Sequence, residues 1–311
     1  MKKENQDASL AKIILVANLY YMNGFSQDRI AKMLQVSRPW VSKLLSKATE
    51  LGLVEIRVNA SMSENRELSD KLRLKYGLKY ASVVEEEEGS YNNSAAAAAN
   101  YFMSRLHSKT IVGAGWGNSV SRMISEMPEI QIPDVQIIPI AGSFGTSMEM
   151  MPNYTAIQIA EKIGGTSVPL HAPAFCSSDE EYEAIRLNKV FADIMEQAEQ
   201  ADVMVVGIGA MNKDLTDRMG IFTKEQIEEL RKAGAVGDIA LNYIDAEGKR
   251  VETSASKRII TTDISKTVKH GKEVIVYATG KEKVQAIRGA LIGKYVSSLI
   301  TSEETAIELL K

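Results

Sequence analysis

Residues 25–58 read FSQDRIAKMLQVSRPWVSKLLSKATELGLVEIRV and carry the clearest pattern in this chain of 311 residues. Ser26 is a residue type that caps helices, and apolar side chains follow it at three- and four-residue spacing from Ile30 to Leu34. This spacing predicts a helix of about two turns. The preceding apolar segment, Ala11–Tyr21, predicts another helix that ends at Asn23-Gly24, a pair suited to closing helices.

The second half of the quoted stretch predicts a third helix, Arg38–Leu51. Ser37 precedes it as a cap, and Pro39 falls in its first turn, where a missing N–H costs nothing. Its apolar residues share one face, and its basic residues lie on the others. Gly52 and an alternating segment, Leu53–Val58, follow and predict a strand. Helix, short turn, helix and strand in this order are the pattern of a winged helix-turn-helix, which inserts its second helix into the major groove of DNA.

The start of the third predicted helix offers candidate contacts to double-stranded DNA. Arg38 suits a bidentate contact to a guanine edge, and Gln27 is a candidate for a phosphate or base contact. Trp40 leaves two interpretations open: its ring packs on a thymine methyl group or a sugar, or it folds back onto the preceding helix as partial core. The predicted set, in which the serines and lysines hold phosphates or cap helices, is Ser26, Gln27, Ser37, Arg38, Trp40, Ser42, Lys43 and Lys47.

The charge of the chain is divided unevenly. The whole chain has 37 Lys+Arg against 40 Asp+Glu. Residues 1–58 contain nine basic and five acidic side chains, a net of +4, so residues 59–311 contain 28 against 35, a net of −7. A small basic part beside an acidic body indicates that the basic part meets a polyanion. We therefore predict a DNA-binding domain over 1–58 and a second domain over 59–311.

The scarcity of cysteine and histidine excludes several classes of protein. Cys176 is the only cysteine, and three histidines are scattered along the chain, which leaves little material for a disulfide or a zinc site. The polar N-terminus does not resemble a secretion signal, and no apolar run approaches the ~20 residues that span a bilayer. We expect a cytoplasmic protein with no metal, no cofactor and no contact with a membrane.

The second domain alternates strand-like apolar runs with helical segments. The expected strands are Ala81–Val84, Thr110–Val112, Val135–Ile140, Ser167–Leu170, Val203–Ile208, Glu273–Ala278 and Val296–Thr301. Such alternation predicts an α/β fold in which a mostly parallel sheet is covered on both faces. Ligands of such sheets bind outside the carboxyl ends of the strands, so the segments that follow the strands are the candidate site.

Glycines and other small residues dominate these segments. Gly113–Ser119 follows a strand and opens a helix, so its N–H groups suit a phosphate, although a plain tight turn is an equal alternative. Gly142-Ser143 and the pair Gly207 and Gly209 would let a ligand approach the backbone closely. The Gly113–Ser119 loop is not a dinucleotide fingerprint, because Asn118 stands at the third glycine position.

Three polar residues near these loops have two readings each. Asn153 either caps the helix Tyr154–Ile163 or points its amide at a sugar hydroxyl. Asp238 either forms a turn or accepts hydrogen bonds from paired hydroxyls. Lys283, with Lys281, starts a helix where the helix dipole disfavours cations, so both are either solvated surface or partners of a bound anion.

Both halves of the chain resemble the SorC family of sugar-responsive bacterial transcriptional regulators. The first half carries SQ-x-x-IA-x-x-L-x-V-SR-x-x-VS, beginning at Ser26, and departs from the family at Trp40, where relatives more often have a small residue. The second half carries GAGWGNSV, GIG, GAVGD, K-x-x-AI-x-GAL and LITSEETA, and departs at Asn118-Ser119 and at Ala278–Gly280. The resemblance implies a Rossmann-like domain akin to sugar-phosphate isomerases, attached to a winged helix-turn-helix.

The resemblance also implies a pocket for a small phosphorylated sugar. Phosphate contacts are implied for Gly115–Ser119 and Gly142-Ser143, sugar contacts for Asn153 and Asp238, and a cationic contact for Lys283. The complete predicted effector set is Gly115, Trp116, Gly117, Asn118, Ser119, Gly142, Ser143, Asn153, Gly207, Gly209, Asp238 and Lys283.

These observations favour a regulator of a carbohydrate-utilisation operon that responds to a sugar phosphate. Two-fold related helix-turn-helix units bind palindromic DNA, so a homo-oligomer, a dimer or a tetramer, is expected. The alternative is a sugar-phosphate isomerase or deaminase with a basic appendage, but His107, His171 and His270 stand in no recognised catalytic motif. A DNA-binding scaffold without a ligand is disfavoured by the small-residue loops at the strand ends.

Overall fold

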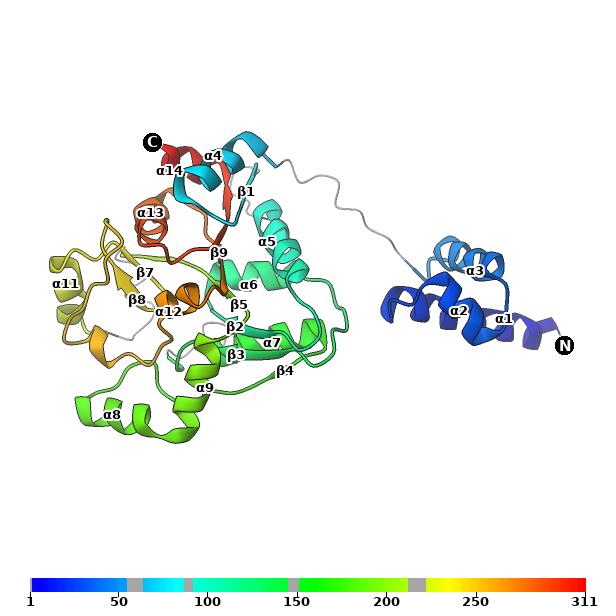
Figure 1. Ribbon diagram of the computed structural model, residues 1–311, viewed down its shortest axis with the longest axis horizontal. Coiled ribbons are helices and arrows are strands. Elements are labelled where there is room, and N and C mark those ends of the chain that lie inside the picture. Colours follow the sequence, from blue (N-terminus) through cyan, green and yellow to red (C-terminus); the bar gives the residue numbers. More distant parts are fainter. Residues whose placement is uncertain (1, 55–63, 87–91, 145–150, 212–221) are drawn as a thin grey trace. The chain divides into compact units, whose positions relative to one another are not determined.

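The computed structural model describes residues 2–54, 64–86, 92–144, 151–211 and 222–311, with side chains from residue 10 onward. The chain divides into two compact units, Met1–Ser61 and Met62–Lys311 (Figure 1). Most of the predicted strand Leu53–Val58 lies outside the described residues, and Leu53 and Val54 form a bend.

The first unit is helical. Its elements are α1 (Lys2–Ala17), the π-helical turn η1 (Asn18–Met22), α2 (Gln27–Leu34) and α3 (Arg38–Glu50). Both predicted caps are confirmed, because the Oγ atoms of Ser26 and Ser37 accept hydrogen bonds from the backbone N–H groups of Arg29 and Trp40, at 3.2 and 3.3 Å. Gln35 ends α2 in the left-handed conformation, with φ of 54°. A small core holds the three helices together through Val16, Ile30, Ala31, Val41 and Leu45.

The second unit is built on a seven-stranded parallel sheet. Its strands are β1 (Tyr80–Val84), β2 (Ile111–Ala114), β3 (Gln136–Pro139), β4 (Thr166–Ser167), β5 (Val203–Val206), β9 (Glu273–Tyr277) and β10 (Ser298–Ser302). Their order is β1-β10-β9-β5-β2-β3-β4. Every strand expected in the second domain is present, with ends that differ by a few residues, so the predicted parallel α/β fold is confirmed.

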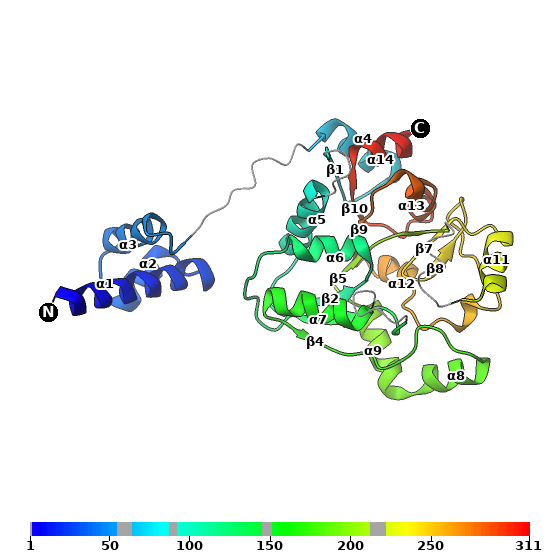
Figure 2. The ribbon, with the colours of Figure 1, turned by 180° about the vertical axis from the view of Figure 1, so that it is seen from behind.

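Both faces of this sheet are apolar and are covered by helices, because apolar side chains point alternately to the two faces. In β5, Val203 and Val205 pack against one layer of helices, whereas Met204 and Val206 pack against the other. The first layer contains α5 (Asn92–Ser104), α6 (Asn118–Ser125) and α7 (Pro152–Ile163). The second contains α4 (Arg66–Tyr76), α9 (Lys189–Glu199), α12 (Ile264–Lys269), α13 (Val284–Ile292) and α14 (Glu303–Leu310). Figures 1 and 2 show the two layers on opposite sides of the strands.

A second, smaller sheet was not expected from the sequence. It is antiparallel and consists of β6 (Gly209–Ala210), β7 (Gly237–Ile239) and β8 (Asn242–Ile244), in that order. The remaining elements are α8 (Asp179–Leu187), α11 (Lys224–Lys232) and the 3-10 turns η3 (Ser256–Arg258) and η4 (Lys281–Lys283). Within the described residues, no helix is long and apolar enough to cross a membrane.

The strand order reverses between β2 and β5. The chain leaves β2 through α6 on one face of the sheet and moves outward to β3 and β4, whereas it leaves β5 toward α12 on the other face and then adds β9 and β10. The connections diverge from two adjacent strands, and this geometry opens a crevice at their carboxyl ends. The fold therefore predicts a ligand site directly after Ala114 and Val206.

Candidate functional site

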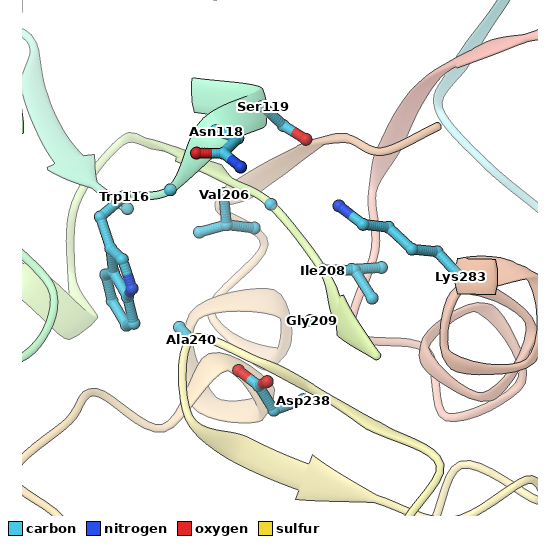
Figure 3. A pocket seen from close by; sticks show the side chains of 12 residues that line it. Trp116, Asn118, Ser119, Val206, Ile208, Gly209, Asp238, Ala240 and Lys283 are labelled. Atoms are coloured by element: carbon cyan, nitrogen blue, oxygen red, sulfur yellow. The ribbon is translucent and has the colours of Figure 1, made fainter. Parts of the chain in front are cut away.

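A pocket occupies this crevice. Its space, counted out to the open mouth and including solvent there, is about 630 Å³. The lining residues come from the segments after β2 and β5, from the small sheet and from the start of α13: Gly115, Trp116, Gly117, Asn118, Ser119, Val206, Gly207, Ile208, Gly209, Asp238, Ala240 and Lys283. Figure 3 shows their side chains around one space.

One end of the pocket presents hydrogen-bond donors. α6 begins there, after Gly117, which has φ of 96° and provides no side-chain cap. The first backbone N–H groups of a helix have no partner within the helix, and the helix dipole makes this end partly positive. The hydroxyl of Ser119 lies beside them (Figure 3). This end of the pocket is therefore suited to an anion such as a phosphate.

Lys283 and Lys281 have different environments, although they share the turn η4. Lys281 is exposed and pairs with Glu304. Lys283 is largely enclosed, and its ammonium group points into the pocket toward the Ser119 side (Figure 3). Burial lowers the pKa of Lys283, and the charges of Glu282 and Asp238 oppose that effect. The solvated-surface interpretation thus fits Lys281, whereas Lys283 supplies a cation to the pocket.

Asp238 lies in β7 on another wall of the pocket. Its Oδ2 accepts a hydrogen bond from the backbone N–H of Leu241 at 2.9 Å, so it does stabilise the turn between β7 and β8. It also lines the pocket, so the two predicted roles are compatible. Gly209 pairs with Asp238 across the small sheet, and a Cβ at Gly209 would meet Asp238 Oδ1 at 2.2 Å. The glycine therefore leaves room for the carboxylate.

Burial raises the pKa of Asp238, and the hydrogen bond from Leu241 and the charge of Lys283 oppose this rise. The folded state therefore binds a proton more readily than the unfolded state. Stability is then lost as the pH rises from the ordinary carboxyl pKa through the raised one. The ionised form of Asp238 is a cost to folding, which is offset when a ligand donates hydrogen bonds to it.

Asp238→Asn is expected to raise the thermal unfolding midpoint at pH values above the raised pKa of Asp238, where the wild-type carboxyl is ionised. Asparagine retains an oxygen that accepts from Leu241 and removes the buried charge. The difference from wild type should shrink as the pH is lowered in steps from 8 to 5, because wild-type Asp238 gains its proton as the pH falls through its raised pKa. Calorimetry across this pH range measures the difference. A variant that is less stable than wild type at every pH would contradict a destabilising carboxylate.

Three lining residues were missed by the sequence analysis: Val206, Ile208 and Ala240. Val206 and Ile208 flank Gly207, and only the pairing of β5 with β2 shows that their segment faces Gly115. The backbone N–H of Gly115 donates to the carbonyl of Val205 at 2.8 Å, and a Cβ at Gly115 would meet that oxygen at 2.7 Å. The sequence signal that could have indicated this pairing was the glycine that follows each of β2 and β5, because glycine lets the two backbones approach closely.

Gly142, Ser143 and Asn153 do not line the pocket among the described residues. The predicted cap at Asn153 is wrong, because Met151 precedes α7 and Asn153 lies inside it. The amide of Asn153 donates to Ser143 Oγ at 3.1 Å and to the Leu170 carbonyl at 2.9 Å, and its oxygen accepts from the Leu170 N–H. These bonds tie two loops together, and a Cβ at Gly142 would meet the Pro173 carbonyl oxygen at 2.3 Å.

The predicted DNA-binding residues of the first unit differ in their solvent exposure. Ser26, Ser37, Arg38, Ser42, Lys43 and Lys47 are exposed, whereas Gln27 and Trp40 are half-buried. Arg38 makes a 3.8 Å ion pair with Asp28 in which both side chains are mostly exposed, so the pair contributes little to stability. Trp40 packs against the core of Val16, Ile30 and Val41, which favours the partial-core interpretation.

Potential metal ligands do not gather in the described part of the chain, where no group of three or more His, Cys, Asp or Glu side chains could hold a metal ion. Cys176 is buried, and burial raises the pKa of its thiol. The described residues that line the pocket form an anion-binding end and include the carboxylate of Asp238.

The chain is similar to known regulators along almost its entire length. Residues 60–311 match the family described as "Putative sugar-binding domain". The deoxyribonucleoside regulator of Bacillus subtilis is 30% identical over 98% of this chain and 98% of its own length. The sorbitol operon regulator of Klebsiella pneumoniae is 29% identical over 99% and 100%, and the crystal structure of that full-length protein, SorC, covers 97% of this chain and 99% of its own with a TM-score of 0.74.

These relatives carry names of transcriptional regulators and not of enzymes, so the isomerase alternative loses its support. The fold, the matched domain and the relatives agree: the chain is a transcriptional regulator with a sugar-binding domain, and it belongs to the SorC family.

Proposed function

We propose that this regulator binds a phosphorylated sugar in the pocket of its second unit and thereby changes the affinity of its first unit for double-stranded operator DNA. The operator belongs to a carbohydrate-utilisation operon, and the protein acts in the cytoplasm, where bacterial operators lie. The first unit corresponds to a DNA-binding domain over 1–58, and the second to an effector-binding and oligomerisation domain over 59–311.

A single observation carries the effector half of the proposal. The uncapped start of α6, the hydroxyl of Ser119 and the ammonium of Lys283 meet at one end of a pocket whose other wall holds Asp238 (Figure 3). A phosphate ester carries close to two negative charges at neutral pH and accepts several hydrogen bonds, so it matches the first three groups. A sugar hydroxyl donates to the carboxylate of Asp238, which is half-buried and is stabilised by such a donor.

The DNA half of the proposal rests on the exposed basic face of α3. Arg38, Lys43 and Lys47 are exposed there, as groove-binding and phosphate-binding side chains must be. Two-fold related copies of α3 would lie ~34 Å apart, or at a multiple of that distance, on a palindromic site. This geometry requires a homo-oligomer, a dimer or a tetramer. The oligomer is proposed to have two quaternary arrangements that differ in their affinity for DNA. The sugar phosphate changes DNA binding only if it binds one arrangement more tightly than the other.

Gly207→Ala tests whether the ligand occupies this pocket. A Cβ at Gly207 would lie 3.8 Å from Ser119 Cβ and from the Trp116 carbonyl oxygen, which is ordinary contact, so the variant should fold. The new methyl group would take space that the phosphate needs. We expect a sugar phosphate that raises the unfolding midpoint of wild type to have little effect on the variant, whose unliganded midpoint stays close to that of wild type.

A thermal-shift screen of sugar phosphates, with each unphosphorylated sugar as its control, makes this measurement. Equal stabilisation of wild type and Gly207→Ala would place the ligand elsewhere. Stabilisation by an unphosphorylated sugar, with every phosphate silent, would remove the phosphate from the proposal.

A further inference from the structure

The wall of the pocket that faces away from Lys283 is aromatic. Trp116 is half-buried and lines the pocket, and Figure 3 shows its indole on the opposite side from the Lys283 ammonium. The indole is held in place from outside, because Phe144 meets it edge-on with ring centroids 5.2 Å apart and an interplanar angle of 71°. Phe144 is itself buried in an apolar cluster. The indole is therefore a rigid surface that a ligand meets in a fixed position.

Apolar side chains extend this surface. Val206, Ile208 and Ala240 line the same pocket, and they belong to the apolar cluster against which Trp116 packs. The donors described above occupy the other end. The pocket is therefore amphipathic: a ligand that fills it has one anionic end and a body with at least one apolar face.

The ring-closed and open-chain forms of a sugar phosphate differ in whether they offer an apolar face. A closed furanose or pyranose ring is rigid and gathers C–H groups on one face, which can pack on an indole while the hydroxyls point to other partners. An open-chain sugar phosphate distributes hydroxyls all along a flexible chain. Packing it on Trp116 would bury hydroxyls without partners and would fix several rotatable bonds.

We infer that Trp116 selects the ring-closed form of the sugar phosphate by packing against the C–H face of its ring. This inference rests on the proposed function, because it assumes that the phosphate occupies the Ser119 end. Trp116 is then a specificity-determining residue, and Asp238 receives a hydroxyl from the edge of the ring.

The test uses the full-length protein with Trp40→Phe, which leaves Trp116 as its only tryptophan. Two matched pairs of probes differ in ring closure and share the phosphate. One pair is methyl ribofuranoside 5-phosphate and ribitol 5-phosphate, and the other is methyl glucopyranoside 6-phosphate and glucitol 6-phosphate. The methyl glycosides cannot open, and the alditols cannot close. Calorimetric titration gives affinities, and the emission of Trp116 reports contact with the indole.

We expect the locked ring of at least one pair to bind about three- to tenfold more tightly than its alditol partner and to shift the emission of Trp116. Trp116→Leu, in the same background, should reduce this ratio to near one, mainly by weakening the locked ring. Because a structural role alone would weaken both partners alike, the ratio isolates the contact.

Four outcomes would overturn the inference, and they separate it from the proposed function. Alditol phosphates that bind as tightly as the locked rings would remove ring selection and leave the sugar-phosphate pocket intact. A ratio unchanged in Trp116→Leu would remove Trp116 from that selection. Methyl glycosides that bind as tightly without the phosphate as with it would contradict the proposed function and the inference together. A failure of all four phosphorylated probes to bind would have the same consequence.

Discussion

Arg38→Ala is expected to weaken specific binding to the operator by about 1–3 kcal/mol, or roughly 5- to 150-fold. Arg38 is exposed at the start of α3, and we propose that it contacts a guanine edge. Its distant, exposed ion pair with Asp28 contributes little to folding, so the variant should retain its structure. Fluorescence anisotropy with labelled operator DNA and with unrelated DNA of the same length measures both affinities.

Two matched variants show what kind of contact is lost. Lys12→Ala removes the same charge from an exposed position on α1 and should leave operator binding nearly unchanged. Lys43→Ala should weaken specific and non-specific binding alike and reduce the salt dependence by about one unit of slope, as for a phosphate contact. If Arg38→Ala lowers affinity equally for operator and unrelated DNA, then Arg38 does not read bases.

Lys283→Ala is expected to weaken binding of the sugar phosphate by about 1.5–3 kcal/mol, or roughly 10- to 150-fold, because a charge-assisted hydrogen bond in an enclosed site is lost. The effect should also depend on pH. Burial lowers the pKa of Lys283, so wild-type affinity should fall as the pH rises through that lowered pKa, where the ammonium becomes neutral. Calorimetric titration of a stabilising sugar phosphate between pH 7 and 10 measures both effects.

Lys281→Ala is the control for this experiment. Lys281 stands two residues earlier in the same turn, but it is exposed and pairs with Glu304, so its loss should leave effector affinity within about twofold of wild type. If the two lysine variants lose affinity equally, the effect is one of general surface charge. If Lys283→Ala retains both affinity and its pH dependence, then Lys283 does not contact the phosphate.

Local patterns were sufficient to predict the helix caps of the first unit and the strands of the parallel sheet. The caps Ser26 and Ser37 act within one helical turn, so the residues that decide them are adjacent in the chain. The strands of the parallel sheet are short buried runs of apolar residues, and such runs are recognisable without tertiary information. The small antiparallel sheet was missed, because its strands have two or three residues and Asp238 and its neighbours resemble a turn.

The site could be predicted correctly only for loops that follow the two strands at the switch point, β2 and β5, because the order of the strands in the sheet cannot be read from the sequence. Gly115–Ser119 and Gly207 follow strands that turned out to be neighbours at the switch point, and both line the pocket. Gly142-Ser143 follows β3, one strand farther along the sheet, and serves as a contact between loops. Lys281 and Lys283 look alike in the sequence, and only the placement of η4 distinguishes the exposed lysine from the enclosed one.

We propose that occupancy of this pocket changes the affinity of the protein for its operator. The most direct test measures operator affinity of the full-length protein with and without the sugar phosphate that stabilises it, for wild type and for Gly207→Ala. We expect the sugar phosphate to change the wild-type dissociation constant at least fivefold, and Gly207→Ala to bind the operator as wild type does without ligand and not to respond. If the sugar phosphate stabilises wild type but leaves its operator affinity unchanged, then occupancy of the pocket does not control DNA binding.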